Sequence, residues 1–117
     1  MAVWTASQVR LAALEHLGIV GAGQAASSED DSLAERNYVS LYARLRQKNL
    51  MPFDRDAVDE WAWDPLAKVL GATMLGAFGF QGSDRRDLEA DAKVGMKQLQ
   101  SGAAMKRAPV SPRGAFF

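Results

Sequence analysis

The chain has 117 residues, a length that suits one domain of ordinary size. Its 14 lysines and arginines balance 14 aspartates and glutamates, so the formal net charge is zero. This balance excludes the simplest argument for nucleic-acid binding, which requires an excess of basic residues. Because neutral small domains tend to associate, the composition favours a chain that works within an assembly.

The chain contains no cysteine, which excludes disulfides, thiolate metal sites and cysteine nucleophiles. No apolar run approaches the roughly 18 residues of a membrane span. The start of the sequence also lacks the basic-then-apolar order of a signal peptide. We therefore expect a soluble, non-secreted protein with no membrane partner.

The first helix is predicted over residues 6–17. Thr5 is a suitable N-cap, and Gln8 three residues later completes a capping box. Gly18 follows the helix at the position where a left-handed C-cap is favoured. A glycine-rich connection is then expected up to Ser27.

Residues 28–48 have the clearest helical pattern in the chain. Three acidic residues at 29–31 suit the positive end of the helix dipole, and basic residues occupy the last turns. Apolar and aromatic side chains recur at helical spacing along one face: Tyr38, Leu41, Tyr42 and Leu45. This segment is predicted to be a helix with one buried face.

Residues 49–64 leave two interpretations open, a loop or an inserted hairpin. Pro52 breaks helical structure, and Met51 and Phe53 fit a short extended segment. Residues 56–63, the next stretch, fit a helical turn.

The third helix is predicted over residues 65–79, with Asp64 as its cap and Pro65 at its first position. Its broad apolar face makes it the central and most buried helix. Gly71 and Gly76 lower its intrinsic stability, and they would be useful if another backbone packs closely there.

A fourth helix is predicted to begin at Ser83 or Asp84 and to end at Gly102. Its inner face is marked by a stripe of four residues: Leu88, Ala92, Met96 and Leu99. Gly95 lies on the same side.

Residues 102–117 are predicted to form an extended arm, because Pro109, Pro112 and Gly114 disfavour a helix. The arm carries three cations and no acidic residue. The fold predicted from these elements is all-α: a four-helix, bundle-like body over residues 1–101 with an extended basic C-terminal arm over residues 102–117.

Acidic residues surround two tryptophans in residues 54–64, and this cluster is a candidate contact surface. Exposed tryptophans often anchor interfaces, whereas the alternative is that they cap the helical core. The carboxylates also suit acid–base chemistry, but no histidine, cysteine or glycine-rich loop accompanies them. The candidate subunit or tail contacts are Trp61, Trp63, Asp54, Asp56, Asp59 and Glu60.

Two other features have simpler structural explanations. His16, the only histidine, stands near the end of the first helix without a ligand partner at a suitable spacing. The acids at 29–31 suit a helix start, and no calcium-loop spacing follows them. We therefore expect no catalytic residue, metal ion or cofactor, and no enzymatic activity.

Three strings, taken in order, resemble a known family. They are SQVRLAALEHLGI at residues 7–19, AKVG at residues 92–95, and MKRAP at residues 105–109. Together they resemble the packaged-DNA stabilisation or tail accessory factors, which are the head-to-tail adaptors of short-tailed phages. The resemblance runs from about Thr5 to Arg113, and residues 49–64 depart from it.

The resemblance implies a non-enzymatic virion protein of the neck, assembled in the host cytoplasm. Such adaptors form a ring, typically of twelve copies, beneath the portal protein. They extend the DNA channel, retain the packaged DNA and provide the attachment surface for a downstream tail or nozzle protein. DNA passes through without sequence-specific binding. Portal docking is carried over to the arm residues Lys106, Arg107, Ala108, Pro109 and Arg113.

Two other classes of protein remain as alternatives. A small helical DNA-binding regulator would need a polar recognition helix, whereas the third helix is apolar and the fourth mixes acids and bases. A hydrolytic enzyme would have to use the carboxylates of residues 54–64.

Overall fold

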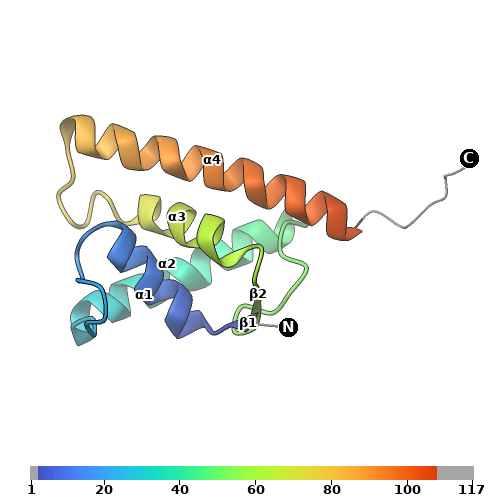
Figure 1. Ribbon diagram of the computed structural model, residues 1–117, viewed down its shortest axis with the longest axis horizontal. Helices are drawn as coiled ribbons and strands as arrows, with labels where there is room; N and C mark the ends of the chain where they lie inside the picture. Colours follow the sequence, from blue (N-terminus) through green and yellow to red (C-terminus); the bar gives the residue numbers. More distant parts are fainter. Residues whose placement is uncertain (1–2, 108–117) are drawn as a thin grey trace, which may run out of the picture.

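The structure, a computed structural model, describes residues 3–107. Within this range the chain forms four helices and one small antiparallel sheet (Figure 1). In chain order the elements are β1 (Val3–Trp4), α1 (Ala6–His16), α2 (Ser28–Gln47), β2 (Val58–Asp59), α3 (Trp63–Thr73) and α4 (Gly82–Arg107). The prediction of an all-α, bundle-like body is confirmed, with the two-stranded sheet as an addition.

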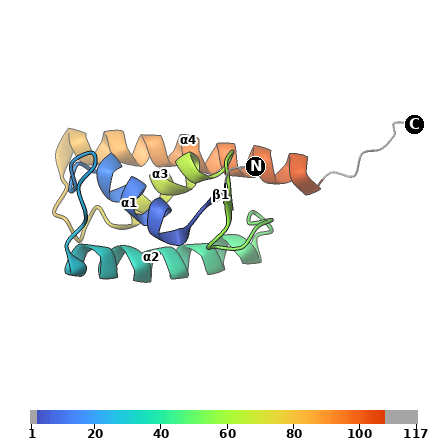
Figure 2. The same cartoon turned by 60° about the horizontal axis from the view of Figure 1, so that its bottom comes forward.

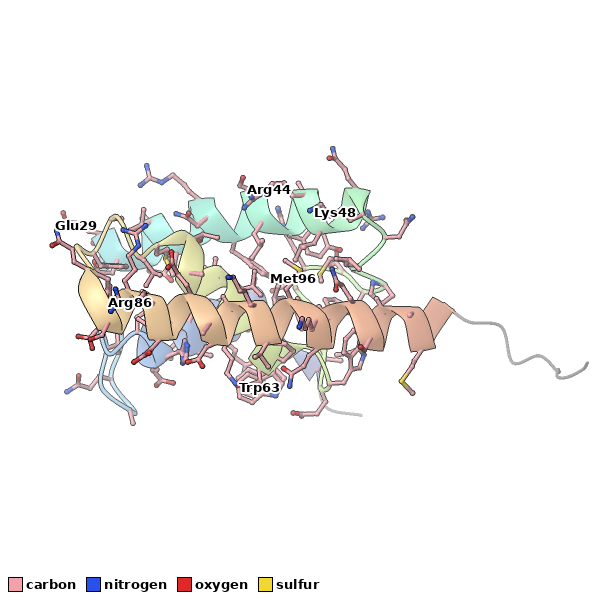
Figure 3. All side chains as sticks on the ribbon, turned by 90° about the horizontal axis from the view of Figure 1, so that it is seen from above. Glu29, Arg44, Lys48, Trp63, Arg86 and Met96 are labelled. Carbon is pink, nitrogen blue, oxygen red and sulfur yellow. The ribbon has the colours of Figure 1, made fainter. Side chains whose placement is uncertain are left out.

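The two longest helices lie on opposite sides of the molecule. α1 and α3 lie between α2 and α4, and these outer helices run in the same direction (Figure 2). Figure 3 shows Glu29 and Arg86, near the starts of α2 and α4, at the same end. The core forms around the inner helices, where Leu14 of α1 and Leu66 and Leu70 of α3 are fully buried.

Helix α1 begins with the predicted capping box. The Thr5 side chain accepts a hydrogen bond from the Gln8 backbone N–H at 3.2 Å, and the Gln8 side chain accepts one from the Thr5 N–H at 2.9 Å. The helix ends at His16, and Gly18 follows with a φ of 76°. Both predicted boundaries of this helix are confirmed to within one residue.

The second helix is also confirmed. Its N-cap is Ser27, whose hydroxyl accepts a hydrogen bond from the Asp30 N–H at 3.2 Å. Asn49 closes the helix end in the left-handed region, with a φ of 60°. All four residues of the predicted inner face are buried: Tyr38, Leu41, Tyr42 and Leu45.

The segment between α2 and α3 is a loop that α2 holds in place. The Tyr38 hydroxyl donates a hydrogen bond to the Arg55 carbonyl at 2.6 Å, and the Tyr42 hydroxyl donates one to the Phe53 carbonyl. No strand forms around Phe53 and no helix forms over residues 56–62, so neither the extended segment nor the helical turn is found where the sequence suggested it. The strand lies instead at Val58–Asp59, where it pairs with Val3–Trp4.

The third helix differs from its prediction at both ends. It begins at Trp63, two residues before Pro65, and it ends at Thr73. The chain then turns toward α4, and Gly79 adopts a φ of 76° within this turn. No backbone packs closely at Gly76, since nothing lies within 4 Å of a Cβ built there. At Gly71 the neighbour is the side chain of Leu17.

The fourth helix continues past its predicted end. It passes through Gly102 and reaches Arg107, so the prediction of an extended arm from residue 102 is wrong over residues 102–107. The helix continues because the Trp61 ring packs on Gly102 and because Ala103 is fully buried on the inner face. The predicted stripe of Leu88, Ala92, Met96 and Leu99 is on the packed side: Leu99 is buried and the other three are half-buried.

Candidate interaction surface

Trp61 links the loop after α2 to α4. Its ring packs against Gly102, where a Cβ would lie 2.2 Å from the ring atom Cζ3. The indole N–H donates a hydrogen bond to an Asp59 carboxylate oxygen at 3.2 Å. Phe53 meets the ring edge-on, with the ring centroids 6.0 Å apart. Trp61 is therefore packed within the fold on three sides.

Trp63 opens α3 and forms a second aromatic contact. Its ring stacks on Trp4, with centroids 3.8 Å apart and planes 12° from parallel. Its N–H donates a hydrogen bond to a Glu60 carboxylate oxygen at 2.6 Å. Seen from above, Trp63 lies at the flank of α4 opposite Met96 (Figure 3). The stack fastens the β1 segment to the start of α3.

The acidic residues of this region mainly stabilise local structure. Asp59 and Glu60 accept the indole hydrogen bonds, and Asp56 accepts one from the Ala6 N–H at 2.9 Å. Asp54 is exposed, and its backbone carbonyl accepts from the Ala57 N–H at 3.1 Å. These contacts agree with the alternative that the tryptophans cap the core. An additional role in subunit or tail contacts stays a prediction.

An open groove runs between the start of α3 and the flank of α4. Its lining combines apolar surface with a polar rim: Trp61, Asp64, Pro65, Val94, Lys97, Gln98, Ser101 and Gly102. Val94 is 54% exposed although it is a large apolar residue. The exposed Asp64 forms an ion pair with the half-buried Lys68 at 3.1 Å. We call these eight residues the α3–α4 groove.

Sequence reasoning found Trp61 but missed the α4 side of this groove. The available signal was the pair Gly95 and Gly102, seven residues apart on the inner face of α4. A Cβ at Gly95 would lie 2.8 Å from the Pro65 carbonyl oxygen, so backbone approaches backbone there. Two glycines on one helix face indicate where a neighbour is closest.

His16, the last residue of α1, lies beside Asp91 of α4. Its Nε2 lies 3.7 Å from an Asp91 carboxylate oxygen. Among the side chains of residues 3–105, this nitrogen is the buried polar atom without a hydrogen-bond partner. The same range holds no group of acidic or histidine side chains suited to a metal ion. In the acidic start of α2, Asp31 forms an ion pair with Arg10 at 3.0 Å.

The predicted portal-docking residues fall into two groups. Lys106 and Arg107 belong to the last turn of α4 and not to an extended arm. Ala108, Pro109 and Arg113 lie outside the described residues. The sequence has no acidic residue after Asp91, so the second half of α4 carries only basic charges.

None of the helices in the described range combines the length and apolarity required to span a lipid bilayer. Comparison with protein-family models, characterised proteins and solved structures finds no match to this chain.

Proposed function

We propose that this chain is a structural adaptor of a phage neck that forms a ring between the portal protein and the tail. The observation that supports the proposal most directly is the placement of α2 and α4. They run in the same direction on opposite sides of the inner helices (Figure 2). A closed ring needs two different faces on each subunit that fit one another, and two parallel outer helices supply such a pair of faces.

Both outer helices leave apolar surface available for neighbours. α2 exposes Val39, and α4 exposes Val94 and Met105. α4 extends about 39 Å at 1.5 Å per residue and packs chiefly on α3. Long helices that are covered on one side suit subunits that complete their packing in an assembly.

The charge distribution supports separate roles for the two ends of α4. Asp91 is the last acidic residue of α4. The charged residues that follow it in the helix are all basic, beginning with Lys93 and Lys97. In the proposal, this end and the following residues dock on the portal: Lys106, Arg107, Ala108, Pro109 and Arg113. The tryptophan and acidic region over residues 54–63 contacts the next subunit or the tail.

The zero net charge fits a channel through which DNA slides. A strongly basic lumen would release counterions from many phosphates and hold the DNA. We therefore expect no sequence-specific DNA binding from this chain. A tight, sequence-specific complex with DNA would favour the regulator class instead.

The portal contact is tested by charge reversal at the two ends of one helix. The full chain is co-expressed with the portal protein encoded in the same genome, and co-purification is measured. Lys106→Glu with Arg107→Glu should lower recovery with the portal at least tenfold. Arg85→Glu with Arg86→Glu, at the opposite end of α4, is the matched control and should leave recovery unchanged. Equal recovery for both variants contradicts the docking assignment.

A further inference from the structure

A hollow beside α2 is lined by an exposed valine and by several carboxylates. Val39, the valine, is 40% exposed. Arg10 of the lining is paired with Asp31 at 3.0 Å, so three carboxylates outnumber the remaining cation, Arg55. We call this surface the α2 hollow. Apart from Ala6 and Tyr38 it is lined by Arg10, Glu35, Val39, Asp54, Arg55 and Asp56.

The outer flank of α4 has an exposed valine and the opposite charge. Val94 is 54% exposed, and Lys93 and Lys97 beside it are exposed as well. Residues three and four apart are neighbours on a helix, so Lys97 adjoins both Val94 and Lys93. We call these three residues the Val94 flank. Among the side chains that the structure describes, neither lysine forms an ion pair, so both cations are available to a partner.

The two surfaces belong to outer helices that run in the same direction (Figure 2) and begin at the same end of the molecule (Figure 3). Val39 is the twelfth residue of α2, and Val94 is the thirteenth of α4. At 1.5 Å per residue they lie about 17 and about 18 Å from their helix starts. In a ring whose axis runs along these helices, Val39 of one copy is therefore level with Val94 of the next.

We propose that the α2 hollow of one copy binds the Val94 flank of the next copy. Val94 packs on Val39, and the two lysines meet the carboxylates of Glu35 and Asp54. Within the described part of the chain, neither of these carboxylates forms an ion pair. Two α2 hollows would bring carboxylates together, and two Val94 flanks would bring lysines together, so unlike surfaces pair. The inference rests on the proposed function, which requires a ring, and it names the surfaces that meet.

Crosslinking between two variants tests the contact directly. Because the chain has no cysteine, Val39→Cys and Val94→Cys each place one thiol in a full-length chain. The two variants are treated with a short bis-maleimide crosslinker, separately and as a mixture, with and without the portal protein of the same genome. The mixture should give at least ten times more covalent dimer than either variant alone. Equal dimer from one variant alone shows contact between like surfaces and overturns the proposal.

A matched control tests the side of α4 that takes part. Gln100 is exposed on the same helix, and six residues of helix turn it about 120° away from Val94. Gln100→Cys mixed with Val39→Cys should give less than a tenth of the dimer that Val94→Cys gives. Unchanged circular dichroism spectra confirm that the variants are folded. Equal dimer from the two mixtures overturns the proposal.

Charge reversal tests the lysines and carboxylates in the same crosslinking mixture. Lys93→Glu with Lys97→Glu, introduced into the Val94→Cys chain, should lower the dimer yield at least tenfold. Glu35→Lys with Asp54→Lys in the Val39→Cys chain should then restore the yield to within about twofold, because opposite charges meet again. A yield that the first reversal leaves unchanged, or that the second does not restore, overturns the proposal.

The outcome is distinguishable from failure of the adaptor proposal. A portal complex with a fixed number of copies but no crosslink between residues 39 and 94 overturns this inference and leaves the adaptor function in place. A crosslink without any portal complex supports the contact and contradicts the adaptor function. Absence of the crosslink, both with and without the portal protein, overturns the inference.

Discussion

The ring of Trp61 occupies the space that a side chain at residue 102 would need. A Cβ on Gly102 would lie 2.2 Å from Cζ3 and 2.4 Å from Cε3 of that ring. The glycine therefore lets α4 approach the loop after α2. Because a larger residue would not fit against Trp61, the loop contacts α4 at this position. Gly102, which looks like a helix end in the sequence, is a contact point five residues before the end of α4.

Gly102→Ala should lower the free energy of unfolding by about 1–3 kcal/mol, because the added methyl group forces the indole or the helix to move. Urea denaturation followed by circular dichroism measures this change. Gly76→Ala is the control, since nothing lies within 4 Å of a Cβ there. It should be neutral or stabilising by up to about 1 kcal/mol. Equal losses in both variants would show that the Trp61 contact is not the cause.

Tyr38→Phe should cost about 1–3 kcal/mol, because the Arg55 carbonyl loses the hydroxyl that donates to it at 2.6 Å. Ser40→Ala, at an exposed position of the same helix, should stay within about 0.5 kcal/mol of the wild type. Thermal unfolding of the two variants gives the comparison. A Tyr38→Phe protein as stable as Ser40→Ala would mean that the loop is held by other contacts.

Stability should also depend on Tyr38 at alkaline pH. Burial, followed by the charges of its neighbours, raises the pKa of the Tyr38 hydroxyl above its ordinary value of 10.0. The unfolded chain therefore loses this proton before the folded chain does, and stability falls as the pH rises above about 10. The limiting slope is about 1.4 kcal/mol per pH unit. The difference between wild type and Tyr38→Phe should shrink from about pH 9 to about pH 11, and a constant difference contradicts this prediction.

The stack of Trp4 on Trp63 should appear as a coupling energy. In a double-mutant cycle with Trp4→Leu and Trp63→Leu, we expect about 0.5–1.5 kcal/mol of coupling beyond the two single losses. Because the rings lie 3.8 Å apart, they share one contact surface. Strictly additive losses would show that the two rings contribute independently.

Local signals predicted much of the fold correctly. The capping box at Thr5 and the left-handed Gly18 depend only on neighbours in the chain, and both are present. The periodic face of α2 also depends on a short stretch of sequence. The inner stripe of α4 was predictable for the same reason, since i, i+3 and i+4 spacing defines a helix face.

The errors arise where distant residues decide the structure. The loop after α2 depends on hydrogen bonds from Tyr38 and Tyr42, which no local pattern reveals. Two-residue strands such as Val3–Trp4 are too short to show a period of two. Helix α4 passes through Gly102 because Trp61 packs there, and this contact joins residues 41 positions apart.

The candidate surface was predictable only in part. The two tryptophans stand out in the sequence, and their contacts with Asp59 and Glu60 explain the acids around them. The α3–α4 groove could not be anticipated, because its walls come from α3, the turn before it and α4, which meet only in the folded chain. Val94 and Ser101 carry no motif that marks them as lining residues.

The measurement that tests the central proposal most directly is native mass spectrometry of the full chain mixed with the portal protein of the same genome. The adaptor proposal predicts one closed complex in which a fixed number of copies of this chain, typically twelve, is added to one portal ring. A chain that stays monomeric, with the mass of the portal unchanged, would contradict the proposal.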